Sequence, residues 1–139
     1  MFTPVSMRSA NTYRSVGLET AVTGASPHQL VGLLFDALQQ SLAVAKGAIL
    51  SGDISAKSRA IGRVVRILEE GLKAGLDVNK GGELAANLRG LYDYCIFKTT
   101  EANMLNDAVL IDEVIRLIAP VADGWSQIRG EVVVQSYQS

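Results

Sequence analysis

The chain has 139 residues, a formal net charge of −1 at pH 7, 48% hydrophobic residues and 19% charged residues. This composition excludes a disordered chain, and the length suits one domain whose core needs no disulfide. The basic excess that is typical of nucleic-acid binders is absent, and one cysteine with one histidine cannot supply a structural zinc site.

The first 25 residues lack a strong helix start, so we expect a mobile N-terminal segment over 1–25 with a short extra helix around Tyr13 to Thr20. Residues 1–12 hold no apolar run of the kind found in secretory signals. No stretch approaches the ~20 apolar residues of a membrane span. The sequence therefore predicts a cytoplasmic protein that does not insert into membranes.

The first long helix is predicted over residues 26–51. Ser26-Pro27-His28-Gln29 has the pattern of a capping box with proline at the first helical position. Leucines then recur every four residues, which indicates one apolar helix face. Gly52 is expected to end this helix in the left-handed conformation, and Asp53 to cap the next one.

Apolar stripes at helical spacing predict three more helices, near residues 54–76, 83–103 and 107–128. Residues 77–82 have the composition of a loop. Pro120 lacks an amide hydrogen and crowds the preceding turn, so a kink or a break is expected in the last helix. Residues 131–139 are expected to form a loose tail.

Four helices joined by short loops must alternate in direction. The sequence therefore predicts an all-α fold, an antiparallel up-down four-helix bundle over residues 26–130 with the N-terminal helix or arm in front of it.

The sequence carries no positive sign of catalysis. His28 is the only histidine, and it is interpreted as a surface residue at a helix start. Cys95 falls on the apolar face of the third helix, where it is expected to be a small buried hydrophobe. No nucleotide-binding loop or zinc-protease motif occurs. We therefore predict a protein that is not an enzyme and that uses no cofactor and no metal.

The second and third helices carry more apolar surface than a single core needs. Apolar and aromatic residues cover almost the whole circumference of the third helix, namely Leu91, Tyr92, Tyr94 and Phe97. A helix that is apolar on several faces is buried on several sides. Enlarged core packing explains this pattern equally well. Otherwise the N-terminal segment, a partner helix or a second copy of the chain, forming a homodimer, covers the surplus.

Several short motifs follow one another in order along residues 13–128. They are Tyr13 with Val16 and Glu19, then 25–30 (ASPHQL), 34–36 (LFD), 71–77 (GLKAGLD), 80–85 (KGGELA), 87–88 (NL), 91–94 (LYDY) and 102–103 (AN). In order and spacing this set resembles the FliS family, the flagellin-specific secretion chaperones of bacterial flagella.

The resemblance implies an antiparallel helical bundle that binds the C-terminal helical region of flagellin in the cytoplasm. It implies that binding keeps flagellin from polymerising before export, and that the pair is delivered to the export gate of the flagellar type III secretion apparatus without nucleotide. The alternatives are a structural or oligomerising four-helix module without a flagellin client and, third, a bundle that binds a small molecule.

We place the client site on the second, third and fourth helices, where apolar surface exceeds what one core needs, with Arg63 and Arg66 at its rim. For Arg59, Arg63 and Arg66 a solvated face is nevertheless the favoured interpretation. We also expect the N-terminal segment to cover the client groove in the free protein. The predicted site residues are Tyr13, Ile61, Val65, Leu68, Leu91, Tyr92, Tyr94, Asn103 and Ile111.

Overall fold

The computed structural model describes residues 25–128, so the expected N-terminal arm, its short helix and the C-terminal tail lie outside the described part of the chain. Between these limits the chain is helical and contains no strand, which confirms the all-α prediction. The elements are α3 (Pro27–Ser51), α4 (Ile54–Arg66), the π-helix η1 (Ile67–Lys73), α5 (Val78–Leu105) and α6 (Ala108–Gln127).

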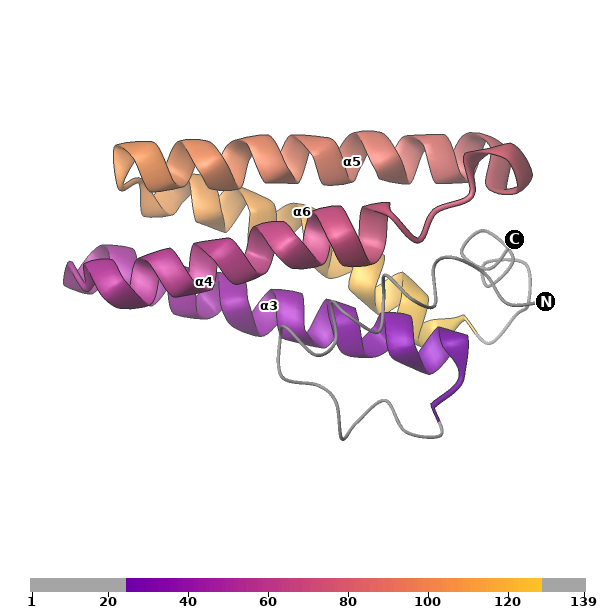
Figure 1. Cartoon of the computed structure of the whole chain (residues 1–139), viewed down its shortest axis with the longest axis horizontal. Helices are drawn as coiled ribbons and strands as arrows, with labels where there is room; N and C mark the ends of the chain where they lie inside the picture. The colour runs from indigo at the N-terminus through magenta and orange to yellow at the C-terminus, as the bar shows by residue number, and fades with distance from the viewer. Residues whose placement is uncertain (1–24, 129–139) are drawn as a thin grey trace.

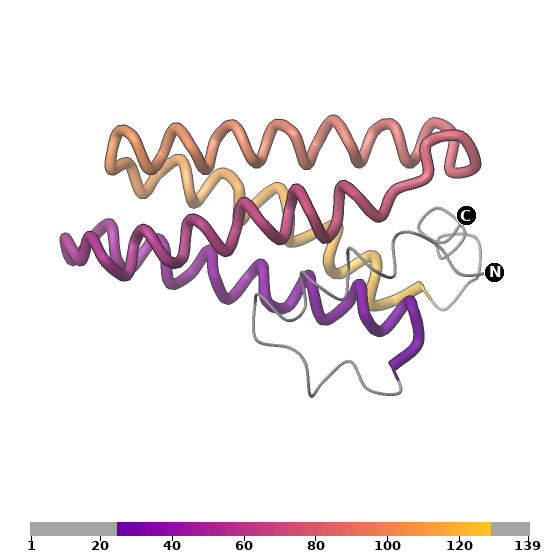
Figure 2. The backbone as a smooth tube through the Cα atoms, viewed as in Figure 1, coloured from indigo at the N-terminus to yellow at the C-terminus, as the bar shows by residue number. Residues whose placement is uncertain are grey.

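Consecutive helices run in opposite directions and lie side by side along the long axis of the molecule (Figures 1 and 2). The helix α3 packs against α4 and α6, and α5 packs against α6, α4 and η1. Each of the four helices therefore packs between two others, and their apolar stripes meet in a shared interior. The core is aliphatic with three large aromatic side chains, Phe35, Tyr92 and Trp125, at 2%, 0% and 6% exposure.

Side-chain caps begin each of the four α-helices. At the start of α3 the Ser26 Oγ accepts from the Gln29 amide at 3.1 Å, and the Ser26 amide donates to Gln29 Oε1 at 2.8 Å, which confirms the predicted capping box. Asp53 caps α4 through the Ala56 amide at 3.0 Å. Gly52, at φ 76°, ends α3 in the left-handed conformation as expected.

The prediction for the start of the third helix was wrong by one turn. Residues 78–81 form a helical turn rather than a loop, because the Asp77 carboxylate accepts from the amides of Asn79 at 3.0 Å and Lys80 at 3.1 Å. Gly82 then departs from helical geometry at φ 59° and ψ −136°, a conformation that side chains disfavour. The predicted start near residue 83 is thus the point where the long straight part of α5 begins.

The second helix changes character half-way along. It is α-helical only to Arg66, and Ile67–Lys73 form a π-helix with i→i+5 hydrogen bonds, which the apolar spacing did not predict. At its end the Ala74 amide donates to the Glu69 carbonyl at 3.2 Å. The wider turn still buries both apolar pairs, Ile67 with Leu68 and Gly71 with Leu72.

The helix α6 continues through Pro120 to Gln127, so the expected break does not occur. Pro120 lies on the exposed side of α6. There water can satisfy the carbonyl that loses its amide partner, and a helix tolerates proline.

His28 is not a free surface residue, as the sequence had suggested, but joins the two ends of the chain's helical part. Its ring stacks on Trp125 with the centroids 4.6 Å apart and the planes at 12°. The His28 Nε2 lies 2.9 Å from the Trp125 carbonyl oxygen, and the Trp125 indole N–H donates to the His28 carbonyl at 2.9 Å. This contact fixes the start of α3 to the last turn of α6 and closes the bundle.

One described helix, α3, is long and apolar enough to cross a membrane by length and composition, contrary to the expectation from the sequence. In the bundle 44% of its apolar window is buried, where α3 packs against α4 and α6. A core helix of a bundle meets the same criteria, so this feature follows from the packing.

Two leucine substitutions test the placement of the core. Leu68 is fully buried, and we expect Leu68→Ala to lower the free energy of unfolding by about 2–5 kcal/mol because it leaves a cavity. Leu50 is 69% exposed at the end of α3, and Leu50→Ala should change that free energy by less than about 0.5 kcal/mol. Urea unfolding followed by circular dichroism measures both, and equal losses would contradict the described core.

Candidate functional site

The nine predicted client-site residues fall into three groups in the structure. Tyr13 lies outside the described residues. Ile61, Leu68, Tyr92 and Ile111 are buried, with at most 6% exposure. Val65, Leu91 and Asn103 are half-buried, and Tyr94 is 40% exposed.

The four buried residues belong to the bundle core. Each helix turns its apolar stripe inward, and these side chains lie on the stripes rather than beside them. They can support a surface from beneath, but the side chains that a partner could touch in this conformation are those of Val65, Leu91, Tyr94 and Asn103.

Leu91 and Tyr94 are brought together on the side of α5 that faces α6. They are one helical turn apart, and the Tyr94 hydroxyl donates to Glu113 Oε2 on α6 at 2.5 Å. This hydrogen bond to a carboxylate raises the pKa of Tyr94, because losing the phenolic proton would place two negative charges side by side. Lys98 lies 5.6 Å from the centre of the Tyr94 ring and 5.9 Å from that of Phe97.

Val65 belongs to α4, and Asn103 lies near the end of α5 that is tied to α4. Lys57 of α4 donates to the Asn103 carbonyl at 3.3 Å and to Asn106 Oδ1 at 2.7 Å, which ties the end of α5 to α4. Arg63 lines the groove between α3 and α4. Since residues two apart on a helix point in nearly opposite directions, Val65 lies on the side of α4 away from α3, and Arg63 is not beside it.

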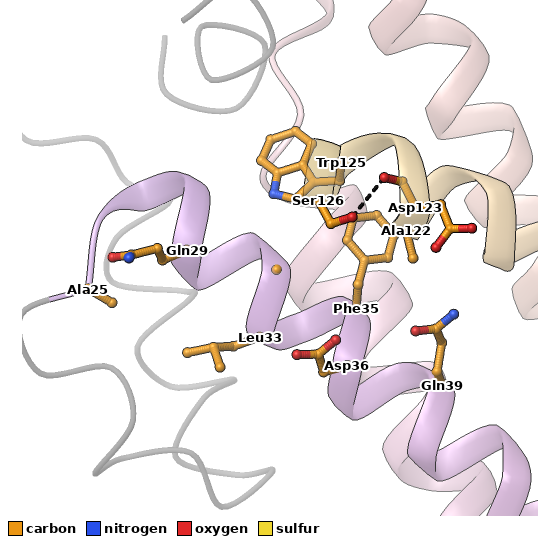
Figure 3. Close-up of a pocket in the computed structure, with 11 residues that line it drawn as sticks. Ala25, Gln29, Leu33, Phe35, Asp36, Gln39, Ala122, Asp123, Trp125 and Ser126 are labelled. Atoms are coloured by element: carbon orange, nitrogen blue, oxygen red, sulfur yellow. Dashed lines mark hydrogen bonds between the residues drawn. The ribbon is translucent and has the colours of Figure 1, made fainter. Parts of the chain in front are cut away.

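The sequence did not predict a groove that lies between α3 and α6. It has a volume of about 600 Å³ and lies beside the joint between His28 and Trp125. Figure 3 shows Phe35 reaching from α3 toward α6, with Asp36 and Gln39 along α3 and Asp123 across from them. The α3 side of the groove overlaps the motifs at 25–30 and 34–36. The α6 side lies about a hundred positions further along the chain, and no motif there indicated a groove.

Three comparisons decide the family. The model of the flagellar protein FliS family matches residues 9–132. The chain is 47% identical over 116 residues to the flagellar secretion chaperone FliS of Salmonella typhimurium, covering 84% of this chain and 86% of that protein. It is 41% identical over 122 residues to the flagellar secretion chaperone FliSB of Pseudomonas aeruginosa, covering 88% of this chain and 96% of that protein.

The chain belongs to the FliS family. This confirms the resemblance found in the short motifs, and the match extends over the whole described bundle. A Bacillus subtilis protein of the same name is 26% identical over 109 residues. The FliS relatives are named as secretion chaperones, which agrees with a surface for a protein partner rather than a catalytic centre.

The titratable groups of this FliS-family bundle lie mainly at its surface, with Cys95 as a buried exception. Within residues 25–128 no three histidine, cysteine, aspartate or glutamate side chains come together as a metal site would require. Two ion pairs link neighbouring helices at the surface, Lys46 with Asp112 at 2.8 Å and Lys73 with Asp93 at 2.7 Å, whereas others, such as that between Lys98 and Glu101, lie within one helix. Cys95 is fully buried, and burial raises the pKa of its thiol from 9.0 to about 12.

The buried thiol gives a prediction about reactivity and pH. At pH 8 Cys95 should not react with a thiol reagent in the native protein but should react in urea, since the thiolate is the nucleophile. In the unfolded chain the thiol ionises near pH 9, whereas the folded protein holds its proton up to about pH 12. The stabilising effect of the raised pKa is therefore complete below pH 9 and is lost as the pH rises above it.

The measurement compares the free energy of unfolding of the unaltered chain with that of Cys95→Ala. Between pH 9 and pH 10 the unaltered chain should lose about 1 kcal/mol more than the variant. Identical pH profiles, or rapid labelling of the native thiol, would show that Cys95 is accessible and ionised.

Proposed function

We propose that this protein is a cytoplasmic, flagellin-specific export chaperone. It binds the C-terminal helical region of flagellin, prevents its premature polymerisation and aids its delivery to the export gate of the flagellar type III apparatus. Membership in the FliS family carries this proposal, together with the names of its relatives as flagellar secretion chaperones.

The accessible apolar surface around α5 supports the proposal. Phe97 is 61% exposed beside the 40% exposed Tyr94, and Leu91 lies half-buried one turn away. An amphipathic client helix would place its apolar face on such side chains, while the tyrosine hydroxyl meets polar groups. Lys98, whose pKa is raised by its hydrogen bond to Glu101, stays protonated and adds a positive charge at the edge.

Binding of this kind needs no nucleotide. A chaperone that covers the apolar face of the client helix competes directly with assembly, because the same face would pair with other subunits in the filament. The unassembled client is then stabilised by mass action, in proportion to the logarithm of the chaperone concentration over its Kd. Release at the export gate requires only a competing partner for the client or the chaperone.

The alternative is an oligomerising module without a flagellin client. One observation favours it, namely five strongly exposed apolar side chains at the end of the bundle formed by the turns 52–53 and 106–107. They are Leu50, Ile54, Met104, Leu105 and Val109, each more than 60% exposed. Such a surface would pair two copies of the chain end to end, giving a homodimer whose mass light scattering would detect.

We propose further that residues 1–25 cover the client groove in the free protein, because a tethered segment acts at high effective concentration. Deleting residues 1–18 should then increase the fluorescence of a dye that binds exposed apolar surface. An unchanged dye signal from a variant with unchanged helicity would argue against the covering segment.

Val65 tests the client site. We expect Val65→Glu to weaken the binding of a flagellin C-terminal peptide by more than about 1 kcal/mol, roughly fivefold, because a charge would face the apolar side of the client helix. Val109→Glu is the matched control, since Val109 is 65% exposed on α6 and lies outside the predicted site. Peptide titration by fluorescence anisotropy gives the affinity.

Circular dichroism on the same samples separates the two explanations of a loss. Reduced helicity in Val65→Glu would mean that the half-buried Val65 is part of the core. Retained helicity with weaker binding supports the groove, whereas retained helicity with full binding would place the client site elsewhere.

A further inference from the structure

A lysine amine lies close to two aromatic rings on the exposed side of α5. The Lys98 Nζ is 5.6 Å from the centre of the Tyr94 ring and 5.9 Å from that of Phe97, which is within the range of a cation–π attraction. The same amine pairs with Glu101 at 3.2 Å, so its charge has a partner within α5. Phe97 is 61% exposed and Tyr94 is 40% exposed, and both rings therefore remain accessible beside the lysine.

Glu113 of α6 places a negative charge next to these rings. Its Oε2 accepts from the Tyr94 hydroxyl at 2.5 Å, which holds the carboxylate beside the ring. The ion pairs in the described part of the chain do not include Glu113, not even with Arg116 three positions along α6. The pKa of Lys98 is raised first by its hydrogen bond to Glu101 and last by the charge of Glu113. Lys98 therefore compensates Glu101 more than it compensates Glu113.

A guanidinium group complements rings and a carboxylate in this arrangement. It is planar and always charged, it stacks on aromatic faces, and it can donate two N–H groups to one carboxylate. A lysine amine is a compact and strongly hydrated charge, so it gains less from an exposed ring. Leu91, half-buried one turn before Tyr94, offers apolar surface to the residues that would flank such an arginine on a helix.

We propose that the surface formed by Tyr94, Phe97 and Glu113 binds an arginine of the amphipathic client helix, and that Lys98 occupies the two rings in the free protein. This contact presupposes the proposed chaperone function and adds the charge that distinguishes one client helix from another. An apolar face alone accepts any amphipathic helix, whereas a charge at its edge selects the partner and fixes its register. The like charge of Lys98 opposes the arginine, so Lys98 lowers the affinity of the complex.

Two synthetic peptides test the recognition. Both are labelled helical peptides of about 18 residues with leucines on one face. They differ at one central position beside that face, which holds either arginine or citrulline, the neutral isostere of arginine. With the full chain, the arginine peptide should bind about fivefold more tightly than the citrulline peptide at about 0.05 M salt, and the ratio should fall at about 0.5 M salt, where charges are screened.

Three variants of the full chain locate the arginine. Glu113→Gln keeps an acceptor for the Tyr94 hydroxyl but removes the charge, so it should weaken the arginine peptide about fivefold and leave the citrulline peptide unchanged. Glu83→Gln is the matched control, since Glu83 is an exposed carboxylate near the start of α5, and it should change neither affinity. Lys98→Gln should strengthen the arginine peptide about threefold, because it removes the repulsion. Circular dichroism checks that all three variants keep their helicity.

A flagellin C-terminal peptide separates this contact from the chaperone function. It should displace the arginine peptide from the full chain, because both occupy the same surface. Equal affinities for the arginine and citrulline peptides, or an unchanged affinity in Glu113→Gln, overturn the arginine site. Weaker binding of the arginine peptide to Lys98→Gln overturns it as well, since the lysine would then attract the partner. If the flagellin peptide does not bind the unaltered chain while the preference for arginine persists, the chaperone function is contradicted and the arginine site is supported.

Discussion

Three short turns determine this structure. The turns at residues 52–53 and 106–107 have two residues and the turn at 74–77 has four, and each ends in an aspartate that caps the next helix. A chain that must reverse within so few residues can only continue antiparallel to the helix it has left. The caps also satisfy amides that would otherwise lack partners at the helix starts. Packing then closes the ring where Trp125 meets His28.

In a closed ring of four helices the apolar stripes cover one another. Apolar side chains that remain exposed therefore need an explanation other than the core. The core needs one stripe from each helix, and these stripes are buried almost completely. Side chains such as Phe97, at 61% exposure, cannot be explained by the core. The helix α5 therefore carries apolar groups both inward and outward, which fits a protein that receives the helix of another chain.

The local features were predictable from the sequence and the long-range ones were not. The capping box at Ser26 and the stop at Gly52 depend on neighbouring residues only, so they were predicted correctly. The cap at Asp77 was missed because a glycine-rich segment favours a loop. Apolar spacing identifies a helix face but not what covers it, and Tyr92 and Ile111 were therefore assigned to a client surface although they lie in the core. The joint between His28 and Trp125 spans 97 positions, which no local pattern encodes.

The helix α4 shows how one element of a small bundle presents two kinds of surface. Its two sides differ in chemistry, with Val65 toward α5 and Arg59 and Arg63 toward α3. A change on one side can therefore be made without altering the other. A charge placed at Val65 disturbs the apolar side alone, whereas a charge change at Arg59 leaves the apolar side intact. The two substitutions therefore distinguish an apolar partner surface from an electrostatic one.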